Sequence, residues 1–341
     1  MTRRKTTALA RVEAFPVASP EVLVKDAEDY AHASISPATV KTYQRHWAAF
    51  VAWCSAAGID PVPAPGASHR SVELYAAAMG KRNAAIKSIR QMISAIGFAY
   101  GSQTNPSPAP ARDPRVRRIM KGIAHTGTED EESAAPFLAA HVQRAVRSLE
   151  DRDDLRAARD RALLTLGFSM AARRSELVAL DVEDLAFNEN GLTVRVGGKR
   201  ASGRVKRTKA NQTAKREEIP IPIGSPECCP VRLTRKWLES SGITSGPVFR
   251  RVWKGDAIVG AKRMCSRTVS DVVKGYAAAL KLPTDAGRYS GHSLRAGFVT
   301  SARKSGVSDK AIMRVTRHKT SVMLDHYDKS NELWKGVVSL L

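Results

Sequence analysis

A histidine and an arginine three residues apart, in His292-Ser-Leu-Arg295, are the first side chains whose spacing suggests chemistry. Residues three apart on a helix share one face, so the imidazole and the guanidinium would project together. A guanidinium offers a planar pair of donors to phosphate oxygens, and an imidazole can donate or accept a proton. On its own, such a pair is more often a solvated feature of a surface helix.

Arg173 and Glu176 show the same spacing in the segment Ala171-Ala-Arg-Arg-Ser-Glu-Leu177, where small residues precede two arginines at a helix junction. An ion pair between them would orient the arginine, although a salt-bridged surface helix has the same pattern. A basic stretch at 195–216 holds nine Lys or Arg and no acidic residue. Most of these charges fit a phosphate-binding loop, while Lys209 is a candidate proton donor.

Tyr327 stands nine residues after His318. On a single helix the two would be about half a turn out of phase, so they converge only if a turn intervenes, and Thr320-Ser321 would supply one as an N-cap. Basic neighbours make the surroundings of Tyr327 electropositive, and tyrosine is among the residues that form covalent intermediates. A lone tyrosine is otherwise most often a core or surface residue.

The charge balance of the whole chain indicates a polyanionic partner. The 341 residues include 55 Lys plus Arg against 33 Asp plus Glu, a net charge of +22. Nucleic acid or an anionic membrane surface would relieve the self-repulsion. No apolar run is long enough for a membrane span, and four cysteines without C-x-x-C spacing fit a reduced cytosolic protein.

We expect neither a metal nor a cofactor. The sequence has no carboxylate cluster of the metal-ligand type, and the histidines at 292, 318 and 326 lack H-E-x-x-H or similar spacing.

The elements that would position these residues fall into two groups, and the first is all helical. Residues 1–34 show no firm periodicity and are predicted to form a flexible arm. Ser36-Pro37 is typical of a helix start, and later helices are expected at about 68–79 and 83–100. The predicted domain spans 35–122.

The second group is mixed, mainly helical with a small antiparallel sheet. An acidic stretch within 123–135 separates two basic blocks and is interpreted as a linker. The domain at 136–330 combines helical patterns with two short predicted strands, at 192–196 and 218–221. The tail at 331–341 carries an apolar face and is predicted to be a terminal helix.

Taken in chain order, the candidates form one pattern. They are Arg173, Lys209, His292-x-x-Arg295, His318 and Tyr327. This order and spacing resemble the tyrosine recombinases, the phage-integrase and Cre-like site-specific recombinases. The resemblance covers about 135–330 and extends to the helical domain at 36–122, where Ala85–Gln91 is similar to the DNA-reading helix of Cre.

The resemblance implies an enzyme that cuts and rejoins DNA. Tyr327 would attack a backbone phosphorus, giving a 3′-phosphotyrosyl link and a free 5′-hydroxyl. Lys209 would protonate the departing 5′ oxygen, and His292 would orient the nucleophile or accept its proton. Because the ester conserves the phosphodiester energy, rejoining would require neither metal nor ATP.

The same resemblance assigns the phosphate-binding role to two arginines and a histidine. Arg173, Arg295 and His318 would supply fixed positive charge and donors to the non-bridging oxygens, where many nucleases place metal ions. Glu176 is expected to buttress this cluster.

The sequence departs from the family pattern at two turns. Ala171-Ala172 replaces the usual Gly-Leu before the first arginine, and Arg317 replaces the usual glycine before His318, which is expected to perturb that turn. Arg174, which directly follows Arg173, remains an alternative as the first arginine of the motif. Three other lysines remain alternatives to Lys209: Lys199, Lys206 and Lys215.

DNA reading is expected from one helix face and a second helix start. Lys87, Arg90 and Gln91 lie on a polar face and would enter the major groove, with Arg267 as a further reader. The alternative is that this face is only solvated. We hypothesise that the two domains form a C-shaped clamp around double-stranded DNA.

The expected assembly is a homotetramer on two DNA sites built from inverted repeats. The tail 331–341 would dock on a neighbouring protomer; the alternative is packing within its own chain. A type IB topoisomerase and a non-catalytic DNA-binding protein are the competing functions. We expect a cytoplasmic, nucleoid-associated protein encoded by a bacterium or a phage, and no membrane partner.

Overall fold

The structure is a computed structural model in which the chain divides into two compact units, 1–130 and 131–341. Each unit is described by itself. The described residues are 19, 22, 25, 29, 30, 35–62, 69–101, 109–126, 134–199, 205–206, 216–253, 258–283, 288–318, 320–321 and 324.

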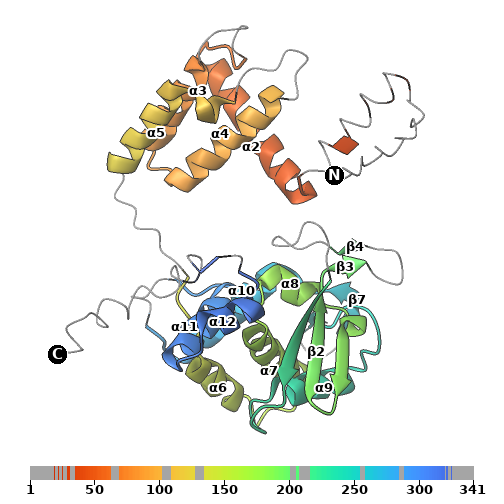
Figure 1. Cartoon of the computed structure of the whole chain (residues 1–341). Helices are drawn as coiled ribbons and strands as arrows, with labels where there is room; N and C mark the ends of the chain where they lie inside the picture. Colours follow the sequence, from red (N-terminus) through yellow and green to blue (C-terminus); the bar gives the residue numbers. More distant parts are fainter. Residues whose placement is uncertain are drawn as a thin grey trace, which may run out of the picture. The chain divides into compact units, whose positions relative to one another are not determined.

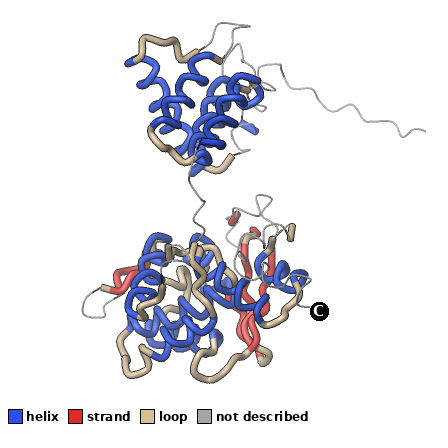
Figure 2. Tube along the Cα trace, turned by 90° about the vertical axis from the view of Figure 1, so that its left-hand side faces the viewer, coloured by secondary structure: helices blue, strands red, loops and turns tan. Residues whose placement is uncertain are grey.

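The described part of the first unit consists of helices and loops (Figures 1 and 2). Its elements are α2 (Pro37–Ala56), α3 (Arg70–Lys81), α4 (Ile86–Gly101), the 3₁₀ turn η1 (Pro110–Arg112) and α5 (Pro114–Thr126). Helix α5 thus extends into the segment 123–135 that the acidic composition assigned to a linker, because the basic, amphipathic pattern that starts at Pro114 continues to that point.

Local signals in the sequence account for these helices. Ser36 caps α2, since its hydroxyl accepts a hydrogen bond from the Thr39 amide at 3.2 Å. The apolar stripe of α4 is buried at Ile89, Ile93 and Ile96 against α2, α3 and α5. Packing of these apolar faces leaves the polar face of α4 in solvent.

The second unit combines a helical core with small sheets. Its helices are α6 (Ala139–Arg147), α7 (Leu155–Ser169), α8 (Arg174–Ala179), η2 (Val182–Asp184), α9 (Pro230–Ser241), α10 (Ser266–Ala279), α11 (Ser293–Lys304) and α12 (Asp309–Thr316). Its strands are β1 (Leu185–Asn188), β2 (Gly191–Val196), β3 (Gly198–Lys199), β4 (Val205–Lys206), β5 (Glu217–Pro222), β6 (Arg250–Val252) and β7 (Ile258–Arg263).

An antiparallel sheet of order β1-β2-β5 lies at one side of this unit (Figure 1). Leu192, Val194 and Val196 of β2 alternate into the core, as expected for a strand with one buried face. The predicted strands at 192–196 and 218–221 are confirmed as β2 and β5. The hairpin β6–β7 was not predicted, because its residues show no clear period-two pattern.

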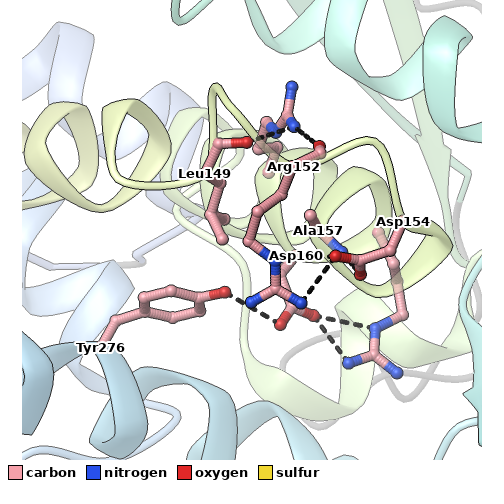
Figure 3. Close-up of polar contacts among 8 residues, drawn as sticks. Leu149, Arg152, Asp154, Ala157, Asp160 and Tyr276 are labelled. Atoms are coloured by element: carbon pink, nitrogen blue, oxygen red, sulfur yellow. Dashed lines mark hydrogen bonds and ion pairs between the residues drawn. The ribbon is translucent and has the colours of Figure 1, made fainter. Parts of the chain in front are cut away.

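Helix α7 runs through the centre of the unit, against α6, α9 and α11, and is buried on nearly every side. It buries charge as well as apolar surface. Asp160 accepts two hydrogen bonds from Arg159, at 2.9 and 2.7 Å, and a third from the Tyr276 hydroxyl of α10 at 3.2 Å (Figure 3). The network therefore ties α7 to α10.

The predicted fold class is confirmed in its main terms: a mainly helical chain with an all-helical first unit and a second unit that adds a small antiparallel sheet. Among the described helices, none combines the length and the apolarity needed to cross a membrane.

Candidate active site

Arg295 is the most deeply buried of the predicted site residues that the structure describes, with 1% of its surface exposed. It lies in the first turn of α11. Its Nη1 donates to the Ala171 carbonyl at 2.7 Å, and its Nη2 donates to the Thr316 carbonyl. Ala171 precedes Arg173 and Thr316 precedes His318, so one guanidinium ties together the two turns that carry the other candidates.

The start of α11 is fixed by a close backbone approach. The Phe137 amide donates to the Ser293 carbonyl at 2.9 Å. At Gly297, an added Cβ would lie 1.9 Å from the Phe137 carbonyl oxygen. Only glycine permits this approach, which holds the helix bearing Arg295 against the segment before α6.

Arg173 and Glu176 form the predicted ion pair at the start of α8. The Arg173 Nη1 donates to Glu176 Oε1 at 2.8 Å, and the Arg173 amide donates to Oε2 at 3.0 Å. Arg174, the alternative by register, is exposed and directs its Nη1 to the Ser270 hydroxyl at 3.3 Å. The geometry therefore favours Arg173 as the arginine of the site.

A third guanidinium joins this carboxylate from a distant part of the chain. Arg317, at the end of α12, donates from Nη2 to Glu176 Oε2 at 2.6 Å. Arg317 has φ +59° and Ala171 has φ +45°, both in the left-handed region. These are the two positions at which the family resemblance implies glycine, the residue that adopts the left-handed conformation without strain.

The carboxylate of Glu176 remains ionised in this setting. Burial raises its pKa, but the Arg317 charge and the hydrogen bonds and charge of Arg173 outweigh that effect and leave the pKa below the usual value.

His318 is 7% exposed and follows Arg317 directly. Burial is the largest cause that lowers its pKa, and the positive charges of Arg295, Arg173 and Arg317 add to it, in that order. The pKa falls to about 4. At neutral pH the imidazole is therefore uncharged and lies among cations.

His292 occupies the N-cap of α11 and is exposed. Its amide donates to the Ser290 hydroxyl at 3.2 Å. His292 precedes Arg295 by three residues, about one helical turn. Lys209 and Tyr327 lie outside the described residues.

The candidate DNA-reading residues occupy exposed positions. Lys87, Arg90 and Gln91 lie on the exposed face of α4, and Arg267 is exposed in the first turn of α10. A groove of about 550 Å³ lies beside Arg90, and residues of α5, among them two more cations, line its other side. The α4–α5 side of the first unit is thus basic.

Sequence reasoning missed two contributors to the site. Arg317 was noted only as a departure from a glycine, because no local pattern links it to a carboxylate 141 residues away. Arg263 of β7 donates to the Val178 and Leu180 carbonyls at 2.5 and 3.0 Å and pairs with Asp181, which holds the end of α8. No signal in the sequence marks that role.

The fold is that of solved integrase and recombinase structures. A lambda integrase dimer bound to a core site matches with a TM-score of 0.56 at 14% identity, over 92% of this chain and 96% of that one. An XerH recombinase bound to a palindromic difH substrate matches with a TM-score of 0.55 at 12% identity, over 81% of this chain and 73% of that one.

Sequence comparisons give the family. The model of the phage integrase family matches residues 138–333. An integrase/recombinase described as a XerD homologue, from Selenomonas ruminantium, is 31% identical over 87% of this chain and 83% of that protein. The tyrosine recombinase XerC of Pelobacter propionicus is 26% identical over 87% of this chain and 90% of that protein. The chain belongs to the phage integrase family.

Proposed function

We propose that this chain is a site-specific DNA recombinase that cuts and rejoins strands through a covalent link to Tyr327. The observation that carries the proposal is the convergence of Arg173, Glu176, Arg295 and His318, which three separate segments bring together: the start of α8, the start of α11 and the turn after α12. It is supported by relatives named as recombinases and by solved relatives that are bound to DNA. A topoisomerase is less favoured, because no relative reported above carries that name.

The cluster has the charge that a phosphodiester requires. The guanidiniums of Arg173 and Arg317 pair with one carboxylate, that of Glu176, and the charges of Arg295, Arg173 and Arg317 all act on His318. The excess positive charge is fixed before any substrate binds, so it can stabilise the charge that develops on the non-bridging oxygens with little reorganisation. Arg173 and Arg295 would donate to these oxygens, as would His318 through its ring N–H.

The proposed step is a transesterification. The phenolic oxygen of Tyr327 bonds to phosphorus while the bond from phosphorus to the 5′ oxygen breaks. The phenolic proton passes towards His292, and Lys209 supplies a proton to the 5′ oxygen. The products are a 3′-phosphotyrosyl ester and a 5′-hydroxyl, and attack by another 5′-hydroxyl reverses the step without metal or ATP.

A nicked suicide substrate tests this proposal. The full-length protein should form a covalent DNA adduct that resists denaturation and forms equally well with EDTA. Tyr327→Phe should form none, while its DNA affinity stays the same because the backbone contacts are intact. Arg295→Lys should also form little adduct, because the compact ammonium of lysine lacks the planar fork by which Arg295 holds two separate carbonyls while donating to a phosphate.

The same experiment distinguishes a recombinase from a DNA-binding protein, a metal-dependent nuclease and a topoisomerase. Wild-type protein that binds the site and forms no adduct would be a DNA-binding protein. Loss of cleavage in EDTA would indicate a metal-dependent nuclease. Adduct formation on any duplex, with relaxation of supercoils, would indicate a topoisomerase.

We further propose that Lys87, Arg90, Gln91 and Arg267 contact DNA, with the two units closing as a C-shaped clamp. The exposure of all four side chains and the basic side of the first unit support this. The targets would be inverted repeats, each half-site bound by one protomer.

The proposed assembly is a homotetramer on two DNA sites in the cytoplasm, on nucleoid DNA. The apolar residues of 331–341 would dock on a neighbouring protomer. A chain without 331–341 should bind a single site as before and lose cooperative assembly in sedimentation; unchanged cooperativity would show that the tail packs on its own chain.

A further inference from the structure

Arg317 occupies an energetically costly position at the end of α12. Its backbone is left-handed, with φ +59° and ψ +35°, a conformation that a residue with a Cβ adopts at a cost. Its side chain is only 9% exposed. A glycine would meet the backbone requirement without strain, so the side chain must have a compensating role.

The polar contact that the structure gives Arg317 is with Glu176. Its Nη2 donates to Oε2 at 2.6 Å. Its Nε and Nη1 are buried without a hydrogen-bond partner. A buried guanidinium with unsatisfied nitrogens is costly, and the charge-assisted bond to Glu176 offsets that cost.

Glu176 transmits this contact to Arg173. Oε2 accepts from both Arg317 Nη2 and the Arg173 amide, and Oε1 accepts from Arg173 Nη1. A carboxylate bound from two sides cannot rotate about its terminal bond without breaking a hydrogen bond. The direction of the Arg173 guanidinium therefore depends on Arg317, although the two arginines bind different oxygens through their side chains.

We propose that Arg317 is a positioning residue, which clamps Glu176 and thereby fixes the Arg173 guanidinium for the scissile phosphate. The proposal rests on the function proposed above. Arg317 itself does not contact the DNA, because its nitrogens are buried behind the carboxylate. We therefore expect Arg317 to affect the rate of DNA cleavage and not the affinity for the DNA target.

The test compares Arg317→Gly, Glu176→Gln and the double variant in single-turnover cleavage of the suicide substrate at saturating DNA. Glycine keeps the left-handed turn and removes the guanidinium. We expect Arg317→Gly to cleave about 10- to 100-fold more slowly, since a small misplacement of a catalytic group has effects of that size. In the Glu176→Gln background, the same substitution should cause little further loss, because the link it removes is already broken.

Three further measurements separate positioning from a general loss of structure. Arg317→Lys should recover part of the rate because it restores the charge. In Arg317→Gly the rate should begin to fall at a higher pH on the acid side, because Glu176 loses a cation that keeps it ionised. DNA affinity and the urea midpoint should stay close to wild type. Arg314→Ala, which removes an exposed charge from the same helix, should leave the cleavage rate unchanged.

Cleavage by Arg317→Gly at the wild-type rate would overturn the proposal. So would a double variant whose loss of cleavage rate equals the product of the losses in the two single variants. If Arg317→Gly does not fold, Arg317→Asn gives the same comparison, because asparagine tolerates the left-handed region. Absence of any Tyr327 adduct in the wild-type protein would instead overturn the proposed function.

Discussion

Burial, and after it the charges of three arginines, set the protonation state of His318 in the folded chain. Burial and three guanidiniums hold its pKa at about 4 in the folded chain. In the unfolded chain its pKa is about 6.5. Between these values the unfolded state binds more protons than the folded state, so acidification favours unfolding.

We expect the free energy of unfolding of the DNA-free protein to fall as the pH drops from about 6.5 to about 4. The difference between the two pKa values sets an upper bound of about 3.4 kcal/mol, at about 1.4 kcal/mol for each pH unit, and solvent screening keeps the contribution of His318 below that bound. Urea unfolding at pH 7.5, 6 and 5 should show a smaller loss in His318→Asn than in wild type. At pH 7.5 the two proteins differ only through packing, and equal pH dependence would contradict the expectation.

At the scale of single residues, the sequence indicated which side chains could take part in chemistry better than it indicated which side chains contact one another in the fold. His292, Arg295 and Tyr327 were weak signals when each was taken alone, and it was the order of the motifs that suggested the family and, through it, phosphoryl transfer. The Arg317–Glu176 pair could not be foreseen, because it depends on where two turns far apart in the chain meet. Which lysine protonates the leaving group stays a prediction.

Among the elements, α11 has the most demanding packing. Its Gly297 meets the Phe137 backbone, and its first turn carries Arg295. The neighbouring backbone cannot move away cheaply, because the Phe137 amide is itself bonded to Ser293. Any side chain at 297 must therefore displace the helix.

Gly297→Ala should lower the free energy of unfolding by about 1–3 kcal/mol, the usual cost of overpacking a core, and should slow cleavage because Arg295 moves with the helix. Urea denaturation and the suicide substrate measure the two effects. Gly275→Ala is the matched control. Gly275 lies in α10, where a Cβ would meet nothing within 4 Å, so alanine should stabilise by about 0.5–1 kcal/mol. Equal effects at the two glycines would contradict the packing argument.

The periodicity of elements with one buried face was predictable from the sequence, whereas the burial of charged residues was not. The stripe of α4 and the alternation of β2 follow directly from the sequence. Arg159 and Asp160 of α7 are buried and bind each other, and no local pattern in the sequence marks that burial. The strand β6 has three residues and β7 has six, and the two pair with each other.

At the scale of the whole molecule, the net charge of +22 makes salt the main variable of DNA binding. Each phosphate contact releases counterions, so the logarithm of the affinity falls linearly with the logarithm of the salt concentration. A residue that reads a base changes the preference for one sequence position, whereas a phosphate contact changes the slope. The two roles are therefore separable by experiment.

Gln91→Ala should reduce discrimination at one base pair by about 1–3 kcal/mol and leave the salt slope unchanged, because it removes no charge. Lys81→Ala, an exposed charge at the end of α3, is the contrasting variant: it should lower the affinity for all sequences alike if it contacts a phosphate. Titrations of specific and scrambled duplexes from 0.1 to about 0.3 M salt measure both. A uniform loss across sequences in Gln91→Ala would show that the face of α4 does not read bases.

Two backbone hydrogen bonds join the first described residues of the second unit to the segment around the start of α11. The Ala135 amide donates to the Arg288 carbonyl at 3.2 Å, and the Phe137 amide donates to Ser293, so these bonds bracket His292. The two bonds consequently fasten the first described residues of the second unit to the start of α11. The orientation of the helix that bears Arg295 is thus set by backbone groups, and substitutions of the side chains at 135 and 137 leave these bonds in place.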